Sequence, residues 1–147
     1  MNYDKLNYAT SPSRPPSWVW NRAVTELRAD ARTVFVYGRT IHTPSGASLD
    51  PPLLAHELTH VVQQIKLGEG DDEAGAQRWW ERNFADAVFR YAQELAAHRR
   101  QYQVFCQDAP YRGPRLRFLH RIAADLAAPL YGGLVTTEQA IQAIRSQ

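Results

Sequence analysis

Two histidines four residues apart, His56 and His60, stand within a stretch of helical periodicity at residues 53–66 (LLAHELTHVVQQIK). Asp50 and the two prolines after it predict the start of this helix, because aspartate caps helix N-termini and proline fits the first turn. One face of the predicted helix is apolar at helical spacing, with Leu54, Leu58, Val61 and Ile65. The histidines lie nearly opposite that face and one turn apart, so both imidazoles can reach one metal ion.

Glu57 follows the first histidine, which gives the order His-Glu-x-x-His. Zinc accepts imidazole nitrogens at about 2.0–2.1 Å and lowers the pKa of a bound water towards about 7. A carboxylate beside the metal can then take a proton from that water. The alternative is a chance match on a solvated helix face, which would not require a glutamate between the histidines. We therefore expect one Zn²⁺ per chain, with Glu57 as the general base.

A catalytic zinc site needs a third protein ligand, and Glu94 is the best candidate. A helical pattern runs from residue 71 to about 104, long enough that we expect a kink or break. Glu94 lies at the edge of its apolar stripe, which comprises Trp80, Phe84, Ala87, Val88, Tyr91, Leu95 and Tyr102. The alternatives are an ordinary glutamate at the flank of the stripe, or another acidic ligand from among Glu73, Glu81 and Asp86.

His98 lies one turn after Glu94 and within the stripe. It could orient a ligand, act as a fourth ligand that closes the site, or be a core histidine. Stabilisation of an oxyanion by a side chain across the site is a further requirement of peptide hydrolysis. Tyr111 and His120 are candidates for this role, although nothing in the sequence places either of them.

The remaining pattern predicts a small α+β protein that is mostly helical, with a β-hairpin or sheet before the helix that carries the two histidines. We expect a proline-rich arm at residues 1–17 and a single domain at 18–147. Val34 to Tyr37 is the clearest strand, with a hairpin around Gly38. The other predicted helices are 21–31, 115–128 and 136–146, the last capped by Thr136 or Thr137.

Composition narrows the classes of function. The single cysteine excludes an internal disulfide, and no apolar run reaches the roughly 20 residues of a membrane span. The net charge is only +2, and the arginines are scattered, so we expect no nucleic-acid partner and no membrane partner. The N-terminus lacks the pattern of a secretory signal, which makes the cytoplasm the default location, although export without a signal peptide is compatible with it. The oligomeric state is not predicted.

The stretch from Leu53 to Gln64, LLAHELTHVVQQ, resembles zinc metallopeptidases of the zincin class. It is similar to compact bacterial and phage-associated gluzincin-like domains, including those encoded near contractile injection systems. The glycine of the metzincin motif is absent, since Gln63 occupies its place. In gluzincins the third ligand is a glutamate in E-x-x-A-D or E-x-x-S-D, which Glu94 to His98 (ELAAH) matches except at His98.

The resemblance covers about residues 34–102 and implies a minimal zincin-like fold with a protein or peptide substrate. We therefore expect a zinc metalloendopeptidase with His56, His60 and Glu94 as ligands and Glu57 activating a zinc-bound water. One alternative is a non-catalytic zinc-binding module, or a cargo or interaction protein of the phage or injection-system type. Another is a nucleic-acid or regulatory partner bound through the arginines of residues 112–121.

Overall fold

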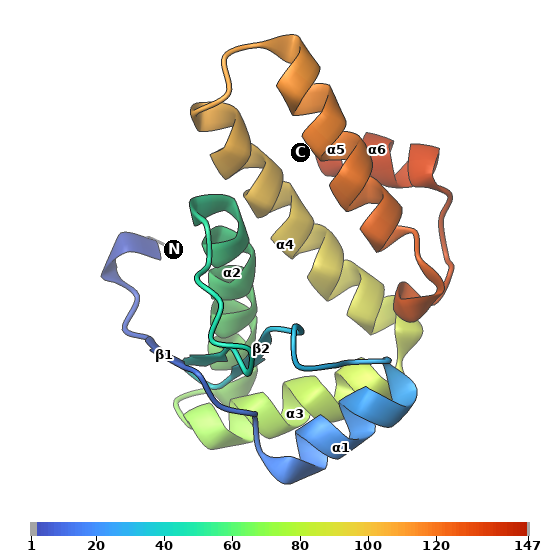
Figure 1. Ribbon diagram of the computed structural model, residues 1–147. Coiled ribbons are helices and arrows are strands. Elements are labelled where there is room, and N and C mark those ends of the chain that lie inside the picture. Colours follow the sequence, from blue (N-terminus) through green and yellow to red (C-terminus); the bar gives the residue numbers. More distant parts are fainter. Residues whose placement is uncertain (1–2, 147) are drawn as a thin grey trace. The chain divides into compact units, whose positions relative to one another are not determined.

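A tight hairpin around Gly38 forms part of a small sheet, as the sequence predicts. The structure, a computed structural model, describes residues 3–146 (Figure 1). Strand β2 (Phe35–Tyr37) pairs antiparallel with β3 (Thr40–His42). Gly38 adopts φ +63°, the left-handed conformation that a two-residue hairpin turn requires. The predicted fold class is confirmed: the described chain is mostly helical, with six α-helices and this sheet.

The N-terminal segment contributes a strand to the sheet. After a 3-10 turn, η1 (Tyr3–Lys5), strand β1 (Ala9–Ser11) pairs in parallel with β3, which gives the order β1-β3-β2. The prolines of the predicted arm come after this strand, where they end the ladder without interrupting it. Helix α1 (Ser17–Glu26) then begins four residues earlier than expected and ends before Arg28, whose φ of +53° is not helical.

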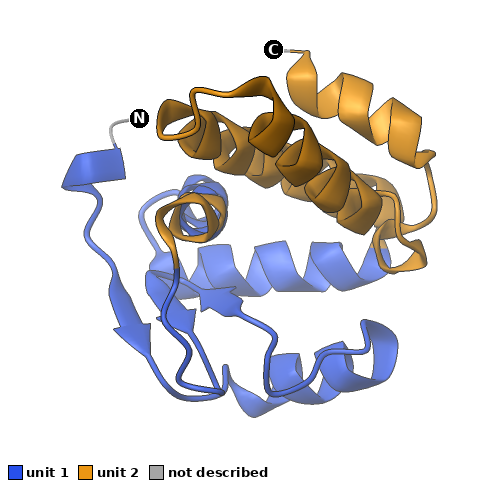
Figure 2. Cartoon of the chain, turned by 45° about the horizontal axis from the view of Figure 1, so that its top comes forward, with its two compact units in different colours: residues 1–49, 57–85 blue, residues 50–56, 86–147 orange. Residues whose placement is uncertain are grey.

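The chain divides into two compact units, coloured separately in Figure 2. Unit 1 comprises residues 1–49 and 57–85, and unit 2 comprises residues 50–56 and 86–147. Helix α2 (Pro51–Gly68) belongs to both, because its first turns cluster with unit 2 and the rest with unit 1. The division into an arm at residues 1–17 and a single domain at residues 18–147 stays a prediction.

In unit 1, helices α1, α2 and α3 (Asp72–Ala85) pack together with the sheet. Gln64 of α2 is fully buried: its Oε1 accepts from the Gly38 N–H at 2.7 Å, and its Nε2 donates to the Val36 carbonyl at 2.8 Å. These bonds fix the hairpin against α2. The buried apolar side chains of this unit are Val19, Ala23, Phe35, Val36, Ile41, Leu58, Val61, Val62, Ala76, Trp79, Trp80 and Phe84.

Unit 2 is helical. It contains α4 (Ala87–Gln107), α5 (Arg112–Leu126), a 3-10 turn η2 (Pro129–Tyr131) and α6 (Thr137–Arg145). Thr136 caps α6 in a reciprocal arrangement with Gln139, which decides between the two predicted caps. The buried core lies on α5 and α6, and α4 packs against it: Phe118, Leu119, Ile122, Ala123, Leu126, Ala140 and Ile144.

The long helical pattern after residue 71 is broken at Asp86, as its length suggested. The Asp86 carboxylate accepts from the backbone N–H groups of Val88 and Phe89 and so begins a new helix, α4. The prediction of one continuous apolar stripe is wrong at Val88, which is 66% exposed, because the break resets the face that α4 buries.

Among residues 3–146, no helix combines the length and the apolar character that crossing a membrane would require.

Candidate metal centre

Helix α2 begins as the sequence predicts and so fixes the spacing of the two histidines. Asp50 accepts from the backbone N–H of Leu53 at 2.9 Å, and two prolines fill the first turn. His56 and His60 then follow one turn apart. Both are buried, with 8% and 5% of their surface exposed. The sequence predicts that the histidines lie on a polar face of α2 opposite its apolar face. This prediction is wrong, because every residue from Ala55 to Val62 is buried and the helix has no exposed face in this stretch.

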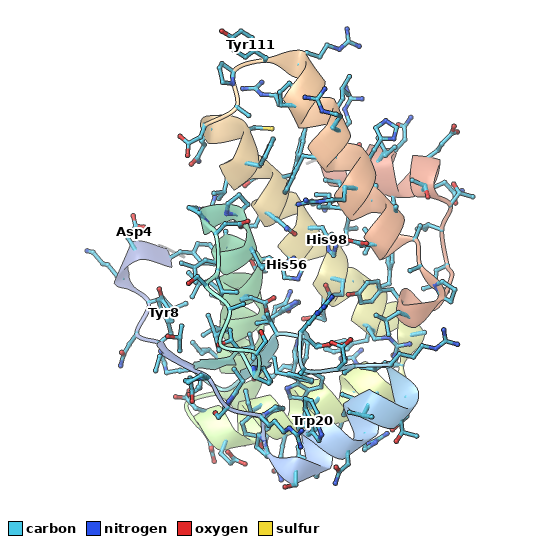
Figure 3. The ribbon with its side chains drawn as sticks, viewed as in Figure 1. Asp4, Tyr8, Trp20, His56, His98 and Tyr111 are labelled. Carbon is cyan, nitrogen blue, oxygen red and sulfur yellow. The ribbon has the colours of Figure 1, made fainter. Side chains whose placement is uncertain are left out.

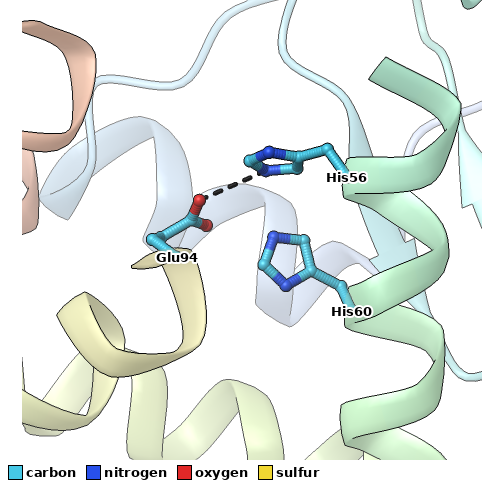
Figure 4. Close-up of side chains that lie close together, drawn as sticks. All are labelled: His56, His60 and Glu94. Atoms are coloured by element: carbon cyan, nitrogen blue, oxygen red, sulfur yellow. Dashed lines mark ion pairs between the residues drawn. The ribbon is translucent and has the colours of Figure 1, made fainter. Parts of the chain in front are cut away.

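Glu94 enters from helix α4 and points at the first histidine. Its carboxylate Oε2 lies 3.2 Å from His56 Nε2, and both side chains are nine-tenths buried (Figure 4). Because both residues belong to unit 2, this contact is part of the packing of that unit.

His56, His60 and Glu94 form a group that could hold a metal ion, with one ligand atom from each lying within 4.8 Å of the others. Two ligand atoms that each lie about 2.1 Å from one tetrahedral metal ion are roughly 3.4 Å apart. The distance between His56 Nε2 and Glu94 Oε2 is close to this value, at 3.2 Å. Burying a carboxylate against an imidazole nitrogen is costly without a compensating charge, which a bound cation provides. The donor set therefore fits a divalent metal.

Glu57 is buried at 6% exposure and stands beside the first ligand on α2. Within the described residues, the group of potential ligands contains Glu94 and not Glu57. The role of Glu57 as a general base stays a prediction.

Each histidine is also held at its second ring nitrogen. His56 Nδ1 lies 2.9 Å from Oε1 of Gln101, and His60 Nδ1 lies 2.8 Å from Oε1 of Gln63. The ring of Trp79 packs on His60 at 5.2 Å between centroids. Neither glutamine is predicted from the sequence as a partner of a histidine, although Gln101 lies two turns after Glu94 and Gln63 lies one turn after His60.

His98 touches the site without joining the ligand group. Its Nδ1 lies 2.7 Å from the Glu94 backbone oxygen and 3.7 Å from the carboxylate Oε2. Its ring packs edge-on against His56 at 4.8 Å and against Tyr131 at 6.3 Å (Figure 3 labels both histidines). The three interpretations of His98 stay predictions, since its Nδ1 is bonded to the backbone of its own helix.

The other predicted participants lie elsewhere. Tyr111 precedes α5, is 75% exposed and lies far along unit 2 from His56 (Figure 3), and His120 is exposed on α5. The rival ligands also have other positions: Glu73 accepts from the Tyr37 hydroxyl, Asp86 caps α4, and Glu81 is exposed on α3. The sequence did not predict that Tyr131 contacts His98.

Asp125 adds a negative group to this part of unit 2. Partial desolvation raises the pKa of this exposed carboxyl, while the charge of Arg121 acts in the opposite direction.

Residues 19–68 match the family model of the eCIS core domain. This domain is named for extracellular contractile injection systems, which agrees with one part of the expected resemblance. The match runs from α1 to the end of α2, so it contains both histidines and Glu57 but not Glu94. No zincin family model matches the chain. Searches of curated proteins and of solved structures give no significant match.

Proposed function

We propose that this protein is a zinc-dependent metallopeptidase in which His56, His60 and Glu94 hold the metal. The observation that carries the proposal is the buried 3.2 Å approach of Glu94 Oε2 to His56 Nε2, one helical turn from His60. Two imidazoles and one carboxylate are the ligand set of thermolysin-type catalytic zinc, which keeps a fourth position open. The histidine–glutamate order on α2 supports the same conclusion.

Glu57 acts as the general base and then as the general acid. Zinc, when bound, would polarise the scissile carbonyl and lower the pKa of the attacking water to about 7. Glu57 takes a proton from this water as its oxygen bonds to the carbonyl carbon. The carbon–nitrogen bond then breaks, and Glu57 returns the proton to the leaving amine.

The first test measures zinc per chain by elemental mass spectrometry, for the native protein, Glu94→Ala and the exposed control Glu81→Ala. We expect about one zinc in the native protein and in the control, and a clear loss in Glu94→Ala. Full retention by Glu94→Ala would show that another residue is the third ligand. No zinc in the native protein after reconstitution would contradict the metal site.

The second test measures hydrolysis of a peptide library by the zinc-loaded protein and by Glu57→Gln. We expect Glu57→Gln to keep its zinc and to lose at least about 100-fold in kcat/KM, the usual contribution of a positioned general base. The matched control is Glu81→Gln, on an exposed face of α3. Unchanged turnover in Glu57→Gln would refute the mechanism.

The similarity of residues 19–68 to the eCIS core domain favours a second candidate, a non-catalytic metal-binding module associated with an injection system. In that case the metal would serve mainly to stabilise the fold. Chelation would then lower the melting temperature strongly, and no library peptide would be cleaved by the zinc-loaded protein.

A further inference from the structure

Both histidines of the metal centre are bonded to glutamine side chains through the same ring nitrogen. His56 Nδ1 meets Gln101 Oε1 at 2.9 Å in a buried hydrogen bond, and His60 Nδ1 meets Gln63 Oε1 at 2.8 Å in a partly buried one. One pair lies within unit 2, and the other lies within unit 1. The same arrangement therefore occurs twice, with partners from different helices, α4 for one and α2 itself for the other.

The chemistry of the amide decides which nitrogen carries the ring proton. An amide oxygen only accepts hydrogen bonds, so the Nδ1 that faces it must be the donor. A neutral imidazole with its proton on Nδ1 has a lone pair on Nε2. His56 Nε2 is the atom that faces Glu94, at 3.2 Å.

We propose that Gln101 and Gln63 are positioning residues that hold His56 and His60 in the Nδ1–H tautomer, which directs both Nε2 lone pairs to the metal. The partner of a metal-ligating histidine is commonly a carboxylate, a backbone carbonyl or water. Here both partners are neutral amides. They orient the rings and add no negative charge, so Glu94 is the one anionic member of the ligand group.

The two glutamines that end the sequence HELTHVVQQ then have different roles. Gln63 holds a ligand, whereas Gln64 is fully buried and bonds to Gly38 and Val36 of the hairpin. Adjacent residues of the same type on one helix thus provide a matched comparison between a positioning role and a structural role.

The inference rests on the metal centre of the proposed function but not on peptide hydrolysis. Its primary test is long-range ¹H–¹⁵N NMR of the imidazoles in the native zinc-loaded protein at pH 8.5, because without metal the Glu94 carboxylate favours a proton on His56 Nε2. We expect His56 and His60 both to show the Nδ1–H pattern. The Nε2–H pattern for either ring would overturn the inference for that histidine, whether or not the protein hydrolyses any peptide.

The second test measures zinc affinity by competition with a chromophoric chelator. We expect Gln63→Met and Gln101→Met each to weaken zinc binding by about 10- to 100-fold, the usual effect of losing such a partner. The tautomer of the affected ring should become mixed in the same variants. Gln107→Met, on the exposed end of α4, should change neither quantity.

Gln64→Met is the structural control. We expect it to lower the melting temperature while the imidazole tautomers and the zinc affinity per folded chain stay native. Gln101→Glu should rescue the defect of Gln101→Met, because a carboxylate also accepts from Nδ1–H. Native zinc affinity in folded Gln63→Met and Gln101→Met would overturn the proposal. Equal losses of affinity in Gln63→Met and Gln64→Met would also overturn it, because they would reduce Gln63 to a structural residue.

Discussion

Gly75 on α3 lies close against the backbone of Gln64 and Gly68 on α2, and we expect Gly75→Ala to destabilise the protein. A Cβ atom built at this position overlaps the backbone oxygen of Gln64 and lies 2.9 Å from both Cα and N of Gly68. All these obstacles are backbone atoms, so no side chain can rotate away. The two helices must separate to admit the methyl group.

The magnitude follows from two opposing effects. Replacing glycine by alanine in a helix interior ordinarily stabilises by about 1 kcal/mol. Forcing a methyl group into a packed contact costs about 1–3 kcal/mol, and the upper end applies where backbone meets backbone. We therefore expect a net loss of about 2 kcal/mol in the free energy of unfolding of Gly75→Ala. For a chain of this size, that loss lowers the melting temperature by roughly 4–8 °C.

Urea unfolding followed by circular dichroism measures this loss, with Gly68→Ala as the graded comparison. A Cβ at Gly68 lies 3.3 Å from Cα and N of Gly75, a tight contact that a shift of a few tenths of an ångström relieves. Gly68→Ala should therefore cost less than Gly75→Ala. Stability of Gly75→Ala equal to that of the native protein, or a larger loss in Gly68→Ala, would refute the packing argument.

Two further predictions concern the start of α2 and the edge of the sheet. Asp50→Ala should lower the free energy of unfolding by about 1 kcal/mol in urea titrations, since the cap on Leu53 is lost. Burial lowers the pKa of His42 below its ordinary value of 6.5, and a hydrogen bond with the Ser13 backbone acts in the opposite direction. As the pH falls through 6.5, the unfolded chain therefore binds more protons than the folded chain. Thermal melts should show stability falling from pH 7.5 to 5.5, and less steeply in His42→Gln.

Much of the fold that positions the site follows from local sequence. The hairpin needs Gly38, and the start of α2 needs Asp50 and its prolines, so both are written in short segments. Strand β1 is different, because Ala9 to Ser11 becomes a strand only by pairing with β3 about thirty residues later. Nothing in the local sequence of this segment predicts that pairing.

The same contrast applies to the candidate site. His56, Glu57 and His60 follow from one turn of helix, whereas the position of Glu94 depends on α4 and its packing. Gln101 was missed because glutamine is not a metal ligand, and its role depends on a contact 45 residues away in sequence. Its register was visible, however: Glu94, His98 and Gln101 stand at helical spacing and are all buried on α4.

The buried Glu94 carboxylate on this face should lower the stability of the metal-free protein and raise its affinity for metal. The Glu94→Gln variant tests both effects. Without metal, the Glu94 carboxylate lies against His56 Nε2 in a buried setting, where a neutral amide is easier to accommodate. At pH 8.5, which favours neutral imidazoles, we expect metal-free Glu94→Gln to be about 1–2 kcal/mol more stable than the native protein. Zinc at 100 times its Kd should stabilise the native protein by about 2.7 kcal/mol and the variant much less, so that with zinc the native protein becomes the more stable of the two.

Thermal melts of both proteins, with and without zinc, measure these two differences in stability. A metal-free variant less stable than the native protein, or an order that zinc does not invert, would show that Glu94 is retained for packing and not for the metal.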